Sequence, residues 1–188
     1  MLTEAQLIYV LIISCEVAFW VVLVLALAAR YLRKRKRLSR GLLICLPLID
    51  LLLITFTAID LRRGTTPTFA HGLAAAYIGF TIAFGPVAVK WADEQFAHRF
   101  AAGPKPPPAP SRGWELVLYD INLWVRCIVA AAITVALVEG LVYVVGDNER
   151  SQPLLAWHKH AFGAIVVWLI LGPIWSLVTA WRRPRADA

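Results

Sequence analysis

Five long apolar stretches fill most of this 188-residue chain, and its polar residues gather in the gaps between them. Apolar residues make up 60% of the composition. A soluble domain of this size cannot bury so much apolar surface, because its surface is large relative to its volume. A lipid bilayer can surround such stretches, so the pattern predicts an integral membrane protein.

The apolar stretches cover about residues 5–29, 41–59, 69–91, 115–145 and 154–181. A helix needs about 20 apolar residues to cross the roughly 30 Å hydrocarbon layer, and each stretch is about that long or longer. Only helices and closed barrels satisfy their backbone groups in lipid. No stretch alternates apolar and polar residues as a barrel strand does. We therefore expect an all-α membrane protein with five transmembrane helices in a single domain, residues 1–188.

Lysine and arginine are distributed unequally between the gaps. Fourteen of them fall on one side if the chain crosses five times, seven of these within residues 30–40, and four fall on the other side. Because positive charge marks the cytoplasmic side, we expect the N-terminus outside and the C-terminus in the cytoplasm. We expect the plasma (inner) membrane as the location and anionic lipid headgroups as the partner of residues 30–40. No nucleic-acid-binding motif accompanies the charge, so we expect no nucleic-acid partner.

The gap between the third and fourth stretches has two parts. Ala92, Phe96 and Phe100 are spaced four residues apart, which gives one apolar helical face. This part is expected to extend the third helix or to lie along the membrane surface. Residues 101–113 contain the run GPKPPPAP, which cannot be helical and predicts an extended cytoplasmic linker.

The second and third stretches weakly match the fourth and fifth at an offset of 87 residues. The matching residues are of kinds that are uncommon in membrane segments: Asp60 with Asp147, Arg63 with Arg150, His71 with His158, and Gly85-Pro86 with Gly172-Pro173. A parallel two-helix repeat would explain them. Two independent hairpins would also explain them, because aspartate suits turns and Gly-Pro kinks helices.

Ionisable residues lie well inside three of the apolar stretches: Glu16, Asp50, Arg126 and Glu139. Such residues are costly in a bilayer and mark functional sites by default. Arg126 cannot readily lose its charge, so it needs a partner, for which Glu16, Asp50 and Asp120 are candidates. A structural ion-pair network and a proton-coupled pathway both account for these groups.

Histidines mark the predicted outer ends of the third and fifth helices. His71 shares a helical face with Ala75 and Gly79, which predicts that it points into a close helix seam. His71 and His158, with His160 nearby, could ligate a metal ion or haem. Interfacial polar residues without a ligand explain the same pattern.

The leading functional hypothesis is the binding, and the translocation, of a small charged solute or ion at a polar site between helices. The expected outer mouth comprises Asp60, Arg63, His71, Asp147, Arg150 and His158, near Glu139. Glu16, Asp50 and Arg126 would continue the pathway inward. The alternatives are a haem- or metal-binding redox protein that uses His71 and His158, and a non-catalytic accessory subunit of a membrane complex.

The sequence also gives predictions about enzymatic activity and about assembly with other chains. It shows no Walker loop, nucleophile elbow or serine triad, which argues against an enzyme. Because the chain is small for a transporter, we expect a homo-oligomer or a subunit of a larger membrane complex.

Overall fold

The computed structural model describes residues 4–31, 35–100, 102–147 and 149–181. Within these ranges the regular structure is helical: α1 Glu4–Tyr31, α2 Lys36–Arg62, α3 Phe69–Phe100, α4 Gly113–Val145, α5 Gln152–Leu169, the π-helical turn η1 Ile170–Ile174, and α6 Trp175–Trp181. Five helical segments are long and apolar enough to cross a membrane, with α5, η1 and α6 forming the fifth. The prediction of an all-α membrane protein with five spans is confirmed.

The helices are longer than the apolar stretches that revealed them. α2 begins at Lys36 and ends at Arg62, several residues beyond the predicted 41–59 on each side. Charged residues lower the hydropathy of these ends without breaking the helix, since long basic side chains reach the interface. α3 continues to Phe100, so the predicted extension of the third helix is confirmed. The linker from 102 to 112 has no regular secondary structure, as the prolines predict.

A π-helical turn interrupts the fifth span, which the sequence predicts as one continuous helix. Pro173 lies inside this turn and cannot donate a backbone hydrogen bond. The wider turn accommodates the proline, and the Ser176 hydroxyl donates to the Pro173 carbonyl at 3.1 Å. The fifth span is therefore made of two α-helical parts that meet at the predicted Gly172-Pro173 kink.

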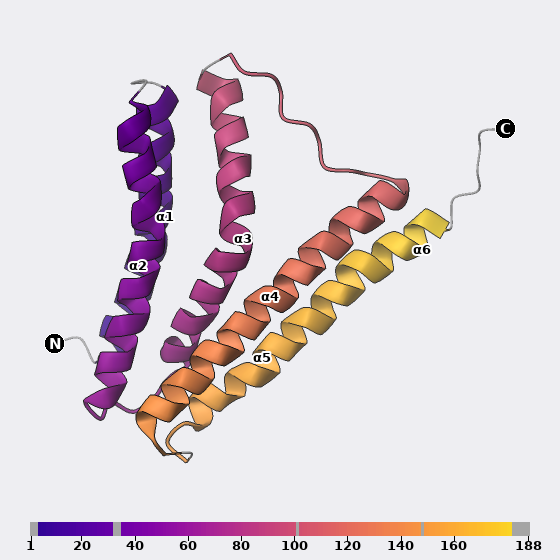
Figure 1. Cartoon of the computed structure of the whole chain (residues 1–188). Coiled ribbons are helices and arrows are strands. Elements are labelled where there is room, and N and C mark those ends of the chain that lie inside the picture. The colour runs from indigo at the N-terminus through magenta and orange to yellow at the C-terminus, as the bar shows by residue number, and fades with distance from the viewer. Residues whose placement is uncertain (1–3, 32–34, 101, 148, 182–188) are drawn as a thin grey trace.

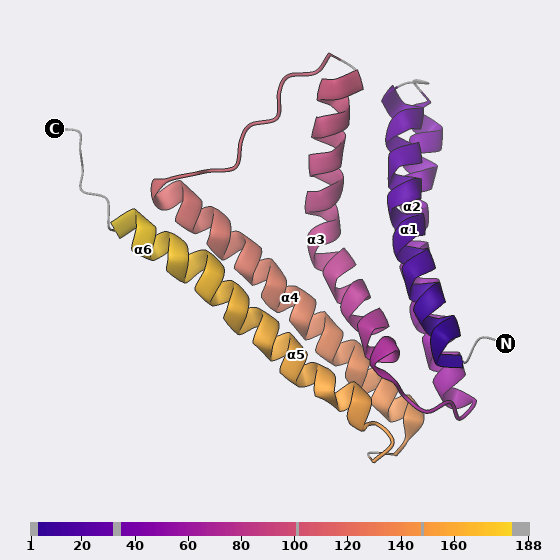
Figure 2. The same ribbon diagram turned by 180° about the vertical axis from the view of Figure 1, so that it is seen from behind.

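Two hairpins lie on either side of α3 (Figure 1). α1 packs along α2, and α4 packs along α5 and the segment that follows it, while α3 contacts both hairpins. The same arrangement from behind shows α3 and α4 diverging toward the end where the linker joins them (Figure 2). We call this the inner end, and the end with the α2–α3 and α4–α5 connections the outer end, following the predicted orientation.

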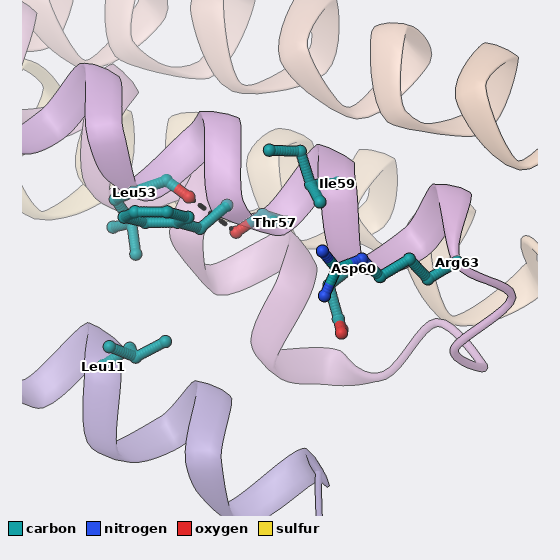
Figure 3. A pocket seen from close by; sticks show the side chains of 7 residues that line it. Leu11, Leu53, Thr57, Ile59, Asp60 and Arg63 are labelled. Carbon is teal, nitrogen blue, oxygen red and sulfur yellow. Dashed lines mark hydrogen bonds between the residues drawn. The ribbon is translucent and has the colours of Figure 1, made fainter.

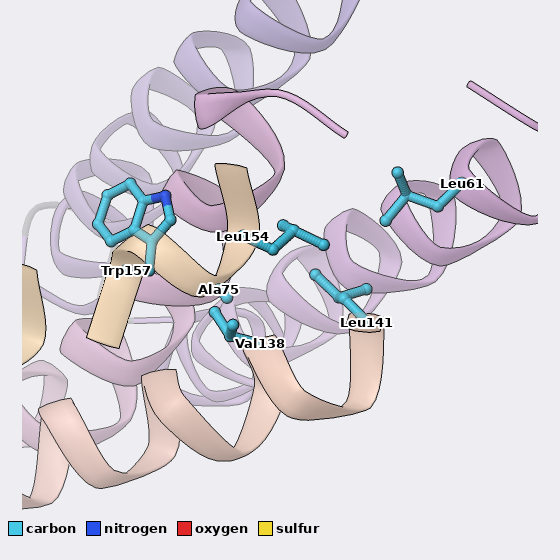
Figure 4. Close-up of a cluster of buried hydrophobic side chains, with 6 residues drawn as sticks. All are labelled: Leu61, Ala75, Val138, Leu141, Leu154 and Trp157. Carbon is cyan, nitrogen blue, oxygen red and sulfur yellow. The ribbon is translucent and has the colours of Figure 1, made fainter. Parts of the chain in front are cut away.

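The helices converge at the outer end around one apolar cluster (Figure 4). Leu61 of α2, Ala75 of α3, Val138 and Leu141 of α4, and Leu154 and Trp157 of α5 are all buried there. Small residues allow this approach. A Cβ atom at Gly72 would collide with the ring of Trp157, and one at Gly79 would lie 2.5 Å from the Ala130 carbonyl oxygen. The molecule is therefore held closed at its outer end.

The inner end of α3 packs against α1. Leu23 and Leu27 of α1 form a buried cluster with Leu46 of α2, and Phe96 of α3 packs against it. Asp93 of α3 accepts hydrogen bonds from Arg30 at 3.4 Å and from the Tyr31 hydroxyl at 3.1 Å. α1, α2 and α3 thus form one unit through the depth of the membrane.

Candidate functional site

His71 is the centre of a hydrogen-bond network at the outer end of α3. Its side chain is fully buried, at 0% exposure, which confirms that it points into a helix seam. The ring Nδ1 accepts a hydrogen bond from the backbone N–H of Thr68 at 3.0 Å, and the Thr68 hydroxyl lies 2.9 Å from the same nitrogen. Nδ1 is thereby assigned as an acceptor, so the ring proton lies on Nε2.

The Nε2 proton of His71 fixes a carboxylate. Nε2 donates to Oδ2 of Asp60 at 3.3 Å, and the Thr65 hydroxyl donates to Oδ1 of the same residue at 3.1 Å. The backbone explains the arrangement: Thr68 immediately precedes α3, and a side chain three residues later reaches back to its N–H, as in a capping box with histidine in the usual glutamate position. The start of α3 therefore positions Asp60 at the end of α2.

Asp60 lies at the edge of a pocket between α1 and α2, shown in Figure 3. The pocket has a volume of about 390 Å³. Its apolar lining is Leu11 from α1 with Leu53, Phe56 and Ile59 from α2, and its polar lining is Thr57, Asp60 and Arg63. Both charged groups belong to the outer end of α2, so the pocket is apolar at depth and charged at its mouth.

The two charged residues of the pocket differ in their partners. Asp60 is 31% exposed and is held by His71 and Thr65. Arg63 is exposed, and none of the carboxylate side chains that the structure describes lies within ion-pair distance of its guanidinium. The hydroxyl of Thr57 donates to the Leu53 carbonyl at 2.9 Å, so its proton is already used within α2. The mouth of the pocket therefore offers a fixed acceptor, Asp60, and an exposed guanidinium, Arg63, that forms no ion pair among the described side chains.

In the second outer loop, between α4 and α5, Asp147 and Arg150 make hydrogen bonds that hold the loop together. Oδ1 of Asp147 accepts hydrogen bonds from the backbone N–H groups of Glu149 at 2.9 Å and Arg150 at 3.2 Å, which closes a turn. Arg150 donates to the Gly64 carbonyl at 3.0 Å and so ties this loop to the loop that carries Arg63. Asp147 and Arg150 thus lie close to the first outer loop without lining the pocket.

Glu139 and His158 form a separate pair between α4 and α5. Nε2 of His158 lies 2.9 Å from Oε1 of Glu139, and Nδ1 lies 2.9 Å from the Leu155 carbonyl oxygen. Both ring nitrogens of His158 face oxygen atoms, whereas Nδ1 of His71 accepts a backbone hydrogen bond. His71 and His158 are therefore not equivalent, although the repeat aligns them.

The histidines are not gathered into a metal site. Nδ1 of His160 lies 2.9 Å from the Ala156 carbonyl oxygen, and its ring packs near the rings of Phe69 and Trp157. No group of three or more His, Cys, Asp or Glu side chains among the described residues is arranged to hold a metal ion. Haem or metal ligation by His71 and His158 would require both rings to give up contacts that they already make.

The predicted inward pathway is described only in part. Arg126 donates to the Ala83 carbonyl at 3.0 Å and to the Asn122 side chain at 3.1 Å. Within the described side chains it forms no ion pair, and Asp120 is not its partner. Glu16 belongs to α1 and Asp50 to α2, but their side chains lie outside those that the structure describes. Their role in a pathway stays a prediction.

Several residues of this site are missing from the sequence-based set. Thr57, Thr65 and Thr68 position or line the pocket, and Leu11 supplies its α1 wall. The pattern Thr68-x-x-His71 at a helix start is a signal that a search for capping boxes could have found. Thr57 and Leu11 give no such signal, because their proximity to Asp60 depends on how α1 packs on α2.

Comparison with known proteins gives one relationship of consequence. No protein-family model matches the chain. No solved structure matches it either. A protein of Bacillus subtilis (strain 168), described as "uncharacterized membrane protein YmcC", is 37% identical over 170 residues, which cover 90% of this chain and 88% of that protein. Because this similarity extends over nearly the whole length of both proteins, the chain belongs to the same family of membrane proteins as YmcC.

Proposed function

We propose that the chain binds a small solute that carries both an acidic and a basic group on an apolar body, in the outer pocket between α1 and α2. The observation that carries the proposal is the joint presence of Asp60 and Arg63 at the mouth of an apolar pocket of about 390 Å³. Pockets of this size, mostly apolar with a few polar groups, are typical ligand sites.

Each charged residue suits one end of such a solute. The network through His71 holds the Asp60 carboxylate in place, so little ordering is needed before it receives an ammonium group. The guanidinium of Arg63 suits a carboxylate or phosphate, which it can bind with two parallel hydrogen bonds. Leu11, Leu53 and Phe56 would cover the apolar body.

Translocation is the second part of the proposal. Asp50 lies ten residues inward of Asp60 on α2, about 15 Å deeper along the helix. Glu16 lies five residues inward of Leu11 on α1. We propose that these carboxyl groups, with Arg126 of α4, form polar steps below the pocket. Uptake by proteoliposomes tests this part: Asp50→Asn should abolish uptake while binding at the pocket persists.

The location in the cell is proposed from the distribution of lysine and arginine along the chain. The bias of basic residues toward one side favours an outer pocket that faces the cell exterior, so we propose the plasma membrane as the site of action. A homo-oligomer or a larger membrane complex remains the proposed assembly.

Binding is tested by thermal unfolding of the purified chain in detergent. The probes are leucine, which has both charges, 3-methylbutylamine, which has only the ammonium group, and 4-methylpentanoate, which has only the carboxylate. We expect leucine to raise the unfolding midpoint most. Asp60→Asn should remove the response to the amine, and Arg63→Gln the response to the carboxylate.

Arg62→Gln is the matched control, because Arg62 precedes Arg63 directly but does not line the pocket. It should leave all three responses unchanged. Equal responses of the wild-type chain and both pocket variants to every probe would contradict the proposal.

A further inference from the structure

A second groove lies between α1 and α3 at the inner end, remote from the outer pocket. Its volume is about 260 Å³, and its lining is almost entirely apolar or aromatic. Leu23, Val24 and Leu27 form the α1 wall, while Trp91, Phe96 and Arg99 belong to the α3 wall. Val24 and Trp91 are exposed, at 50% and 57%, so the groove opens sideways toward the lipid.

The polarity of this groove changes along its length. The hydrogen bond from Arg30 to Asp93 fixes the level at which α1 ends. Arg99 lies six residues further along α3, about 9 Å beyond that level. Leu23 lies seven residues before Arg30 and therefore deeper in the membrane. The groove is thus apolar at depth and cationic at its inner mouth. A phospholipid of the inner leaflet has the matching order, with acyl chains at depth and its headgroup at the surface.

Among the described residues, positive charge at the inner end exceeds the carboxylates that pair with it. The two carboxylates of this part of α3 are already engaged: Asp93 with Arg30 at 3.4 Å, and Glu94 with Lys90 at 3.9 Å. Among the described residues, no carboxylate pairs with the other described arginines at this end, which are Arg35, Arg37, Arg40, Arg99 and Arg112. Arg99 is the one of these that lines the groove.

We propose that the α1–α3 groove binds an anionic phospholipid of the inner leaflet. One acyl chain lies along Leu23, Val24 and Leu27, and the phosphate lies at Arg99. The charge complementarity supports a phosphate, which a guanidinium binds well. The sideways opening and apolar wall support a lipid rather than a soluble phosphate, because basic pockets between helices at the cytoplasmic side suit lipid headgroups. This site is independent of the outer pocket.

The test measures lipid retention and stability of the full chain purified in mild detergent. Native mass spectrometry after addition of phosphatidylglycerol or phosphatidylcholine should show one phosphatidylglycerol retained preferentially. Thermal unfolding should shift upward with phosphatidylglycerol and not with glycerol 3-phosphate. Arg99→Gln should reduce the preference for phosphatidylglycerol about tenfold, the effect of losing one charge-assisted hydrogen bond.

Two further variants separate the groove from general charge attraction. Arg112→Gln removes an exposed inner-end charge that does not line the groove, and it should keep the wild-type preference. Val24→Trp fills the groove without changing charge, and it should reduce retention of both lipids. Equal losses in Arg112→Gln and Arg99→Gln would overturn the proposal in favour of diffuse attraction. Stabilisation by glycerol 3-phosphate equal to that by phosphatidylglycerol would overturn the assignment of a lipid.

Discussion

At the scale of single residues, His71 and His158 have the same spacing from an aspartate but different hydrogen-bond partners. Each lies eleven residues after an aspartate. Asp60 bonds to His71, whereas Asp147 closes a turn after the left-handed Gly146, and His158 bonds to Glu139 instead. His71 is bound as a neutral ring with one acceptor nitrogen, while His158 faces two oxygen acceptors.

The His71 network predicts a large effect of this buried side chain on stability. His71→Leu leaves the Thr68 N–H without its acceptor and removes one of the two donors to Asp60. The unsatisfied N–H alone should cost about 1–3 kcal/mol. Unfolding by SDS titration measures the loss. His160→Leu is the control, since His160 is exposed and its Nδ1 contacts only its own helix; it should change the stability by less than about 0.5 kcal/mol. A similar loss in both variants would contradict the role of the network.

Arg126, a charged residue within the fourth span, is hydrogen-bonded to neutral oxygen acceptors and forms no ion pair among the described side chains. It donates to the Ala83 carbonyl, in the turn of α3 that precedes Pro86. Pro86 has no N–H, so the Ile82 carbonyl four residues earlier loses its helical donor, and the proline ring disturbs this turn. The adjacent Ala83 carbonyl accepts from the neighbouring helix through Arg126. The arginine therefore connects α4 to the kink in α3.

This connection predicts that Arg126 and Pro86 act together. Arg126→Met should cost about 1.5–3 kcal/mol, the range for hydrogen bonds to charged groups. In the double variant with Pro86→Ala, the straightened helix reclaims its carbonyls, so the two losses should fall short of additivity by at least about 0.5 kcal/mol. A double-mutant cycle in SDS unfolding measures this coupling, and strict additivity would show that the kink and the arginine are independent.

At the scale of whole helices, the small residues of α3 were the most predictable feature. The spacing of His71, Ala75 and Gly79 predicts a close seam, and Ala75 is fully buried while Gly79 lies against the Ala130 carbonyl. The existence of five spans was equally predictable, because hydropathy alone determines it. The contacts of the ionisable groups were not, since they depend on how far each helix extends and how its neighbours rotate. The sequence-based site therefore grouped residues that the structure divides among the pocket, the second loop and the Glu139–His158 pair.

The α3–α5 seam predicts a contrast between two glycines. Gly72→Val places a side chain onto the ring of Trp157, and overpacking of this kind costs about 1–3 kcal/mol. Gly163→Val, on α5, meets nothing within 4 Å and should be tolerated. The unfolding midpoint in SDS compares the two variants. Equal tolerance would mean that α3 and α5 do not approach as closely as the structure shows.

At the scale of the whole molecule, the arrangement is closed at the outer end and open at the inner end. The buried cluster that includes Leu61, Val138 and Leu154 joins four helices at the outer end, whereas α3 and α4 diverge toward the linker (Figure 1). The proposed solute pocket lies at the closed end and the proposed lipid groove at the other. This division has functional meaning only if the two ends face opposite sides of the membrane.

Cysteine labelling in intact cells tests that orientation. In a variant whose three native cysteines are replaced by alanine, Thr66→Cys places a thiol in the exposed α2–α3 loop, and Ala109→Cys places one in the exposed linker. Because basic residues favour the cytoplasmic side, a membrane-impermeant maleimide should label Thr66→Cys in intact cells and Ala109→Cys only after the cells are opened. The reverse pattern would invert the orientation, turning the solute pocket toward the cytoplasm and the lipid groove toward the outer leaflet. Labelling of both sites in intact cells would mean that α3 does not cross the membrane, since α3 alone separates these two segments.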